Sequence, residues 1–550
     1  MLIGILVFAV LLIAVLYPNV FTFVGSFFPS GTFSVATYVR FFETPSAREA
    51  LFNSLFISVA TVVLSAAIGI PLAFLLHRYD FRGRRILRAM ASAPVLLPPL
   101  VGVISFLFLY GESGIISRGL QVVLGLDRPW PQMTGVPAIL FVHAYSMYVY
   151  FFMFTSAGLE RLDAAMEEAA ETLGASGFEK LRRVTLPLLA PSFVGAALVT
   201  FMSSMASFSA PLIFGGGVRV LAVEIFNSKL NGNIPMALVE TVILAASSLA
   251  VLFLLRWYEG RRKYSLTGKG VSVQRRPINS GFAKAAAALG GTVAVIFLIL
   301  PHLMVLVMSF VQEGTWTTQI VPPAYTTANY VRLFRDPSFF EPIRNSLWMS
   351  VLATGANLAW GLMATFWLRR RTGWVRRVAD ILIVLPWALP GTVVAIAMVE
   401  SFSRFAGTVM LLPFLYFVRN IPIVVRAIDA SFQQVDPSIE EAAISLGATS
   451  TYTIRRVVLP LVLPGAIAGS LLAFITALGE FVSSIMVYVY SNRPISIEIL
   501  SQLRQFNFGT ASAYGFLLIV LIAVTLLVGE RLHGPVIESR RALLRDPLVP

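Results

Sequence analysis

Long apolar runs separated by short polar stretches make up most of this sequence. A helix needs about 20 mostly apolar residues to cross the hydrocarbon core of a bilayer, and the runs predict about 12 such helices. In the first half they cover roughly 2–24, 52–76, 90–110, 136–158, 190–214 and 236–256. In the second half they cover roughly 285–310, 345–368, 378–401, 408–428, 463–488 and 511–530. The pattern therefore predicts an all-α polytopic membrane protein.

Composition agrees with that prediction and excludes a water-soluble globule. Apolar residues make up 57% of the chain and charged residues 13%, with a mean hydropathy of +0.80. A formal charge of +14 could indicate nucleic-acid binding, but the basic residues lie in short clusters between the apolar runs. Loops on one side of the membrane hold 29 Lys and Arg and those on the other hold 12, while Arg419 lies inside a predicted span. The positive-inside rule then places both termini in the cytoplasm.

Several kinds of chemistry find no support in the sequence. The chain has no cysteine, so disulfides and thiol chemistry are excluded. Its four histidines are scattered without paired helical spacing, which supports neither a metal site nor a catalytic triad. No phosphate-binding Gly-x-x-x-x-Gly-Lys-Ser/Thr pattern occurs. We therefore expect no cofactor, no metal and no ATP hydrolysis by this chain. The first run lacks a basic start and a cleavage site, so we expect a span there, not a removable signal peptide.

Two polar loop segments, 163–187 and 436–460, share one pattern at an offset of 273 residues, and we call them the first and second docking segments. The pattern consists of Glu167, Glu168, Ala169, Ala170, Gly174, Leu186 and Pro187 in the first, and Glu440, Glu441, Ala442, Ala443, Gly447, Leu459 and Pro460 in the second. Both segments are predicted to face the cytoplasm. Identical placement in the two halves predicts a surface that binds a cytoplasmic partner, and an ordinary amphipathic loop helix is the alternative.

Each docking segment should form two short helices around a hinge. Asp163 and Asp436 are suited to cap the first helix, because a carboxylate accepts hydrogen bonds from its unpaired N–H groups. Gly174 and Gly447 should break that helix. The Leu-Pro pair should end the segment, since proline disfavours helix in the residue before it.

The repeat extends well beyond the docking segments. Asn53-Ser54-Leu55 matches Asn345-Ser346-Leu347 at an offset of 292, so the first half carries 19 extra residues, which we place in the external stretch 111–132. Equivalent spans keep the same orientation, which indicates two parallel six-helix repeats. The predicted organisation is a first repeat at 1–258, a flexible cytoplasmic linker at 259–283, a second repeat at 284–534 and a cytoplasmic tail at 535–550.

Polar residues inside the fifth span of each half are candidates for the lining of a translocation path. Such residues are costly in a membrane and usually face a bundle interior or water. They are Ser203, Ser204, Ser207 and Ser209 in the first half, and Thr476, Glu480, Ser483 and Ser484 in the second. Ser207 and Glu480 are equivalent at the 273 offset. Helix packing is the alternative role, since hydroxyls also serve close interhelical contacts.

The pattern Glu-Ala-Ala, three residues, Gly, nine residues, an aliphatic residue, one residue, Leu-Pro resembles the coupling motif of importer-type ABC transporter permeases, and it matches in both copies. The resemblance implies a fused type I permease whose two coupling helices each bind one copy of a separate ABC ATPase. It also implies an external solute-binding protein and the cytoplasmic membrane of a prokaryote, surrounded by lipid.

The closest similarity is to ferric-iron uptake permeases, on the stretches 479–484 and 497–500, the second of which is matched by 223–226. Relatives of that group carry thiamine, polyamines or phosphonates, so these solutes stay open as cargo. A carboxylate at Glu480 would favour a cation. By class, the alternative is a secondary transporter, which is expected to show inverted repeats and broken helices. A channel or a membrane-embedded enzyme is the third class.

Overall fold

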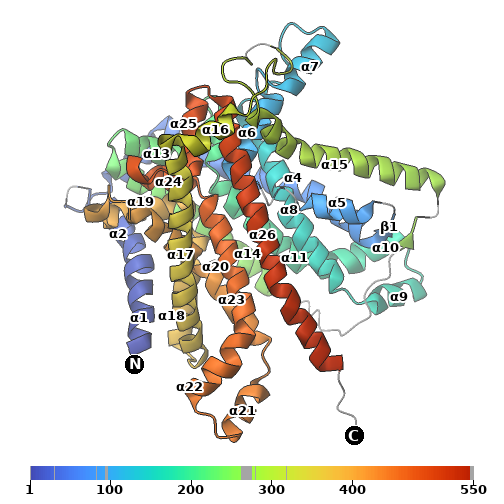
Figure 1. Cartoon of the computed structure of the whole chain (residues 1–550), viewed down its shortest axis with the longest axis vertical. Coiled ribbons are helices and arrows are strands. Elements are labelled where there is room, and N and C mark those ends of the chain that lie inside the picture. The colour runs from blue at the N-terminus through green and yellow to red at the C-terminus, as the bar shows by residue number, and fades with distance from the viewer. Residues whose placement is uncertain are drawn as a thin grey trace. The chain divides into compact units, whose positions relative to one another are not determined.

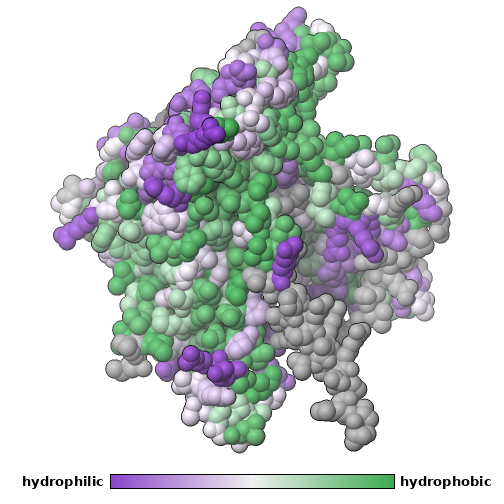
Figure 2. All heavy atoms as spheres, viewed as in Figure 1, coloured by the Kyte–Doolittle hydropathy of each residue, from purple (hydrophilic) through white to green (hydrophobic). Residues whose placement is uncertain are grey.

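The computed structural model describes residues 2–29, 31–81, 83–92, 94, 97–261, 276–278, 280–316 and 319–545 (Figure 1). This part of the chain is almost entirely helical, as predicted. It contains 11 helices that are long and apolar enough to cross a membrane, and one further pair of helices joined by a sharp bend. On the face drawn in Figure 2, hydrophobic residues cover most of the surface over α17 (Pro337–Arg369) and over the coloured part of α26 (Phe508–Arg545).

The chain divides into two compact units, Ser26–Thr327 and Met1–Gly25 with Ala328–Pro550. The first of these contains α3 (Ala36–Glu43), α4 (Pro45–Arg78), β1 (Tyr79–Asp80), α5 (Arg84–Ala91), α6 (Pro99–Tyr110), α7 (Ile115–Leu124), α8 (Gly135–Glu160), α9 (Ala164–Thr172), α10 (Gly177–Lys180), η3 (Leu181–Thr185), α11 (Leu186–Met205), α12 (Ser209–Phe214), α13 (Leu221–Leu230), α14 (Ile234–Arg261), β2 (Arg276–Pro277) and α15 (Gly281–Ser309).

The second unit contains α1 (Leu2–Val10), η1 (Leu11–Leu16), most of α2 (Tyr17–Phe27), α16 (Ala328–Arg335), α17, α18 (Trp374–Ala388), α19 (Gly391–Ser401), η4 (Ser403–Phe405), α20 (Leu411–Gln433), α21 (Pro437–Ser445), α22 (Ser450–Thr453), η5 (Ile454–Val458), α23 (Leu459–Leu478), α24 (Val482–Val487), η6 (Tyr490–Asn492), α25 (Ile495–Arg504) and α26.

The same three-helix centre is found in each unit. It consists of α4, α8 and α11 in one and of α17, α20 and α23 in the other. Close approach of α4 to α8 depends on Gly69, where an added Cβ would lie 2.5 Å from the carbonyl oxygen of Tyr148. In the other unit the centre buries an apolar cluster that includes Val424, Ile428 and Val462.

Equivalent hydrogen bonds join the first half of α4, and of α17 in the other unit, to a later helix of the same unit. Asn53 donates to the carbonyl oxygen of Arg219 at 3.0 Å, and Ser54 Oγ accepts from the N–H of Leu221 at 2.9 Å. In the other unit Asn345 donates to the carbonyl oxygen of Arg493 at 3.3 Å, and the Oγ of the next serine accepts from the N–H of Ile495 at 2.8 Å. The Asn-Ser pairs noticed in the sequence therefore hold the starts of α13 and α25.

The first span of each repeat packs within the unit of the other repeat. In one unit α1 lies on α17, where the rings of Phe8 and Trp367 meet edge to face at 5.8 Å. In the other, α15 packs on α5 and α6, and Tyr145 donates to the carbonyl oxygen of Leu298 at 2.6 Å. The compact units thus differ from the sequence repeats, whose boundaries stay a prediction.

Some predicted boundaries differ from the structure. The third span of the second half bends by 108° between α18 and α19. The fifth spans, predicted as continuous, end at Met205 and Leu478 and are followed by the short helices α12 and α24. Pro386 in the last turn of α18 and Pro390 directly before α19 account for the bend, since proline interrupts a helix.

The extra residues of the first half contain α7, between α6 and α8, where the second half has only the three-residue helix η4. Of the predicted linker, residues 262–275 and 279 lie outside the described residues, and β2 between them pairs in parallel with β1. The described part of the predicted tail continues α26 as far as Arg545.

Candidate functional site

The first helix of each docking segment is capped as its sequence predicts. Asp163 accepts a hydrogen bond from the N–H of Ala165 at 3.0 Å, and Asp436 accepts one from the N–H of Ser438 at 2.9 Å. The backbone N–H and then the side chain of Ser438 hold the pKa of Asp436 below its ordinary value, because both donate to the charged carboxylate. The capped helices are α9 and α21.

Both hinges depend on a left-handed glycine. Gly174 has φ +81° and Gly447 has φ +86°, and an added Cβ would meet nothing within 4 Å at either position. Backbone conformation, not lack of space, therefore requires glycine here. The following alanines close the helix ends, with the N–H of Ala175 bonded to the carbonyl of Ala170 and that of Ala448 to that of Ala443, both at 3.0 Å.

The prediction that Leu-Pro ends the docking segment is wrong. The helix continues through the pair by way of a π turn, η3 in the first half and η5 in the second. In these turns the N–H of Leu186 bonds to the carbonyl of Leu181, and that of Leu459 to that of Ile454. A proline presses on the carbonyl four residues earlier and cannot donate to it, and a wider turn relieves both effects. Each second docking helix is thereby joined directly to the fifth span.

The predicted coupling residues differ in how far they are exposed to solvent. Exposed are Glu168, Ala169, Gly174, Glu441, Ala442, Gly447 and Pro460; half-buried are Ala170, Leu186, Pro187, Glu440, Ala443 and Leu459. Glu167 alone among them is buried, with 7% of its surface exposed, and it forms an ion pair with Arg78. Figure 1 shows α21 and α22 as a projecting hairpin at the end of α23.

Two exposed leucines were missed by sequence reasoning. Leu173 is 88% exposed and Leu446 is 90% exposed, and each directly precedes its hinge glycine. Met166 and Ile439 are exposed on the same two segments, at 51% and 40%. Paired apolar residues on otherwise polar loops are typical of a protein interface. The 273 offset that aligns the glycines also aligns both pairs, so this signal was present in the sequence.

A polar network lies at the break between α23 and α24. The carboxylate of Glu480 is 3.7 Å from the guanidinium of Arg419 on α20, and it also accepts from the N–H of Ser483 at 2.9 Å. Ser484 Oγ donates to the carbonyl of Glu480 at 2.6 Å, and the hydroxyl of Tyr416 forms a hydrogen bond of 2.7 Å with the same Ser484 Oγ. The side chains of Arg419 and Glu480 are only 19% and 10% exposed. Pairing neutralises a carboxylate that was expected to act alone.

This network also reaches the bend between α18 and α19. Arg419 donates to the carbonyl of Leu389 at 3.5 Å, and Ser483 donates to the carbonyl of Gly391 at 3.4 Å. Broken backbone at membrane depth persists where it is buried in protein or lines a water-filled path. The two breaks of the second half are therefore held together by side chains from α20 and α24.

The first half has a cluster of one histidine and three hydroxyl groups at the equivalent place. Nε2 of His143 on α8 forms a hydrogen bond with Ser207 at 2.8 Å. Its Nδ1 lies within hydrogen-bond distance of Thr61 and of Ser204, at 3.2 Å from each hydroxyl. His143 and Tyr416 are equivalent at the 273 offset, as are Ser207 and Glu480. The two halves thus place different chemistry on one scaffold.

The remaining candidates lie apart from these clusters. Ser203 is half-buried, and Thr476 donates only to the carbonyl of Leu472 in its own helix, at 2.9 Å. Ser209 is buried, and its Oγ has no hydrogen-bond partner among the described residues. The structure therefore groups Ser204 with Ser207, and Glu480 with Ser483 and Ser484. Ser203, Ser209 and Thr476 belong to neither group.

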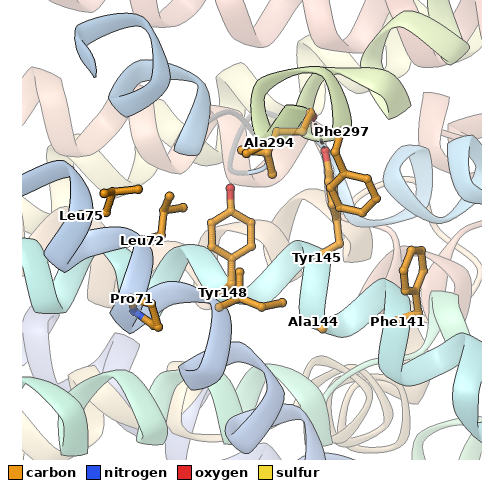
Figure 3. A pocket seen from close by; sticks show the side chains of 11 residues that line it. Pro71, Leu72, Leu75, Phe141, Ala144, Tyr145, Tyr148, Ala294 and Phe297 are labelled. Carbon is orange, nitrogen blue, oxygen red and sulfur yellow. Dashed lines mark hydrogen bonds between the residues drawn. The ribbon is translucent and has the colours of Figure 1, made fainter. Parts of the chain in front are cut away.

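An apolar cavity of about 450 Å³ lies between α4, α8 and α15 (Figure 3). Its lining includes Pro71, Leu72, Phe297 and two tyrosines. Tyr145 and Tyr148 both donate their hydroxyls to backbone carbonyls, the latter to that of Ala91 at 2.7 Å. A charged solute would lose its hydration there without gaining partners, so we assign no transport role to this cavity. Among the described residues no group of three or more His, Asp or Glu is placed to hold a metal ion.

Comparison with known proteins gives a consistent answer. Residues 65–264 and 357–534 both match the family described as binding-protein-dependent transport system inner membrane component. A protein of Sinorhizobium fredii described as a probable ABC transporter permease is 29% identical over 513 residues, 91% of this chain and 89% of the relative. The ferric transport system permease protein FbpB of Actinobacillus pleuropneumoniae is 26% identical over 546 residues, 97% of this chain and 78% of the relative.

A third relative matches a smaller part of the chain. The molybdenum transport system permease protein ModB of Mycobacterium tuberculosis is 30% identical over 213 residues, which are 38% of this chain but 79% of the relative. Most of that permease therefore corresponds to less than half of this one, in agreement with two fused repeats. With two family matches, two docking segments and a multi-pass helical fold, the chain belongs to the binding-protein-dependent inner-membrane permeases of ABC importers.

Proposed function

We propose that the two docking segments each bind one copy of a separate ATPase subunit, and that this chain itself hydrolyses no ATP. The observation that carries the proposal is that Leu173 and Leu446 are both almost fully exposed to solvent. Each lies directly before a hinge glycine with a left-handed backbone conformation. The lack of a phosphate-binding pattern in the sequence agrees with it. Closure of the ATPase subunits would move the docking helices, and the π turns would pass that movement to α11 and α23.

The other partners follow from the family. The proposal includes an external solute-binding protein that delivers cargo to the side where α13 and α25 begin, with both termini of this chain in the cytoplasm. The excess of basic residues in the loops on the docking side supports that orientation. Lipid of a prokaryotic cytoplasmic membrane would surround the apolar surfaces.

Ferric iron is the cargo we propose. Support comes from relatives named as ferric transport permeases, including FbpB, which aligns with nearly the whole chain. The path would pass the helix breaks, where Ser204 and Ser207 in one half and Glu480, Ser483 and Ser484 in the other supply polar groups.

An oxyanion such as molybdate is the second candidate. Because Arg419 neutralises Glu480, the network has no net charge, which removes the electrostatic preference for a cation over an anion. The similarity to a molybdenum permease agrees with this candidate, although it covers only 38% of the chain.

Uptake by a reconstituted complex tests these proposals. The chain would be placed in proteoliposomes with an ABC ATPase and a solute-binding protein from the same organism, with ATP inside, and offered radiolabelled ferric citrate or radiolabelled molybdate. The proposal predicts ATP-dependent uptake of iron and none without either partner. Uptake of molybdate but not iron would overturn the ferric assignment and leave ATP-driven import intact. Uptake that needs no ATPase would overturn the whole proposal.

A further inference from the structure

The first docking segment contains a glutamate that does not face outward. Glu167 has 7% of its surface exposed, whereas its neighbour Glu168 is exposed. A buried carboxylate is costly unless charged or hydrogen-bonding partners compensate it. The partners of Glu167 therefore identify the elements to which the docking segment is attached.

Three elements meet at this carboxylate. Arg78, the last residue of α4, reaches both of its oxygens, at 3.2 Å from Nη1 and more closely from Nη2. Thr185 in the π turn η3 donates to it at 2.8 Å. The guanidinium of Arg78 also lies over the ring of Phe74, 5.4 Å from its centre. That of Arg369, at the end of α17, likewise lies 4.9 Å from the ring centre of Phe432, so this contact does not distinguish the two docking segments. Glu167 thus joins α9 to the end of α4 and to the base of α11.

The second docking segment has a weaker version of this contact. Glu440 is paired with Arg369, the last residue of α17, by a single 3.5 Å contact, and about a third of each side chain is exposed. Water screens such a pair, which weakens it. The position equivalent to Thr185 is Val458, whose side chain cannot donate a hydrogen bond. Within the part of the chain that the structure describes, Glu440 therefore joins α21 to α17 and forms no hydrogen bond with η5.

We propose that the two docking segments are unequally fastened, with Glu167 holding the first rigidly to α4 and α11 and Glu440 holding the second loosely to α17. Glu167, Arg78 and Thr185 act as positioning residues. Movement imposed on the first segment is then passed to its membrane helices at once, while the second segment first tilts on its hinge. The transport role of this difference rests on the proposed docking of the ATPase, but the difference in fastening does not.

Hydrogen–deuterium exchange on the purified chain in lipid nanodiscs tests the fastening without any partner. Glu167→Gln should speed amide exchange in 164–172 by about tenfold, the loss expected for one charge-assisted hydrogen bond. The matched change Glu440→Gln should speed exchange in 437–445 by less than about threefold, as for an exposed pair. Thr185→Val should speed exchange in α9, and Val458→Thr should slow it in α21. Equal effects of the two glutamate changes would overturn the inequality.

The same variants, assembled with the ATPase and the binding protein, test the role in coupling. The readout is the ratio of ATP hydrolysis with the binding protein to that without it, which needs no knowledge of the cargo. Glu167→Gln should lower this ratio by about tenfold while the ATPase still copurifies, and Glu440→Gln should lower it less. The double variant Arg78→Gln, Glu167→Gln leaves no charge unpaired and serves as the check on folding.

An unchanged ratio in Glu167→Gln would overturn the coupling role even where exchange behaves as predicted. A parent chain that never retains the ATPase would instead overturn the docking proposal, and the coupling role with it. The hydrogen–deuterium exchange experiment would still test whether the two docking segments are unequally attached. Failure of the docking proposal can therefore be distinguished from failure of the unequal attachment.

Discussion

The guanidinium of Arg419 and the carboxylate of Glu480 lie 3.7 Å apart, one on α20 and the other at the break after α23. Their pairing changes the electrostatic argument for the cargo. A lone carboxylate would favour a cation, whereas this pair has no net charge and holds two helix breaks together. The assignment of Glu480 to the translocation path stays a prediction, and it now includes Arg419.

Changes at this pair should affect transport in a definite order. Glu480→Gln leaves Arg419 unpaired, and Glu480→Lys adds a second positive charge beside it, so we expect the lysine variant to lose more ATP-dependent uptake. The double variant Arg419→Gln, Glu480→Gln should recover about tenfold over Glu480→Lys, because no buried charge is left unpaired. Thr476→Ala, which removes a hydroxyl bonded only within its own helix, is the matched control.

Assembly of each variant is followed by gel filtration, so that folding defects are not counted as transport defects. Parent-like uptake in both assembled Glu480 variants would make the residue structural and end its assignment to the path.

Valine at the hinge glycines should release the ATPase. At Gly174 and Gly447 φ is positive, and forcing a β-branched residue into that region costs about 1–3 kcal/mol. We expect Gly174→Val with Gly447→Val to reduce copurification of the ATPase by about tenfold or more while membrane insertion is unchanged. Gly177→Val is the control, because Gly177 also has open space but an ordinary φ. Full transport by the double variant would refute the hinge requirement.

Polar residues at the exposed leucines should weaken docking. Burying one leucine in an interface contributes about 1.5–3 kcal/mol, so Leu173→Ser with Leu446→Ser should lower the affinity for the ATPase by more than about tenfold. Titration of the ATPase onto the chain in nanodiscs measures this directly. Leu124→Ser on α7 is the control, because Leu124 is 57% exposed and lies outside both docking segments. An unchanged Kd would remove these leucines from the interface.

Local features were predictable from the sequence. The caps at Asp163 and Asp436 and the hinges at Gly174 and Gly447 depend on side-chain chemistry and φ within a few residues, so a short pattern determines them. The long spans were predictable because a bilayer sets their length and polarity.

Features that depend on distant residues were not predictable. The burial of Glu167 depends on Arg78, which lies 89 positions earlier in the chain. The pairing of Glu480 with Arg419, and the packing of α1 on α17, likewise require knowledge of which helices meet. The helical path through Pro187 was missed because proline rules describe an α-turn, and the chain uses a π turn there.

Native mass spectrometry of the complex purified through this chain measures the central claim most directly, because it counts ATPase subunits. The account predicts two ATPase copies for each chain, and one copy when only Gly174→Val or only Gly447→Val is present. Recovery of an active transporter from this chain alone, or a single ATPase copy on the unmodified chain, would contradict the account.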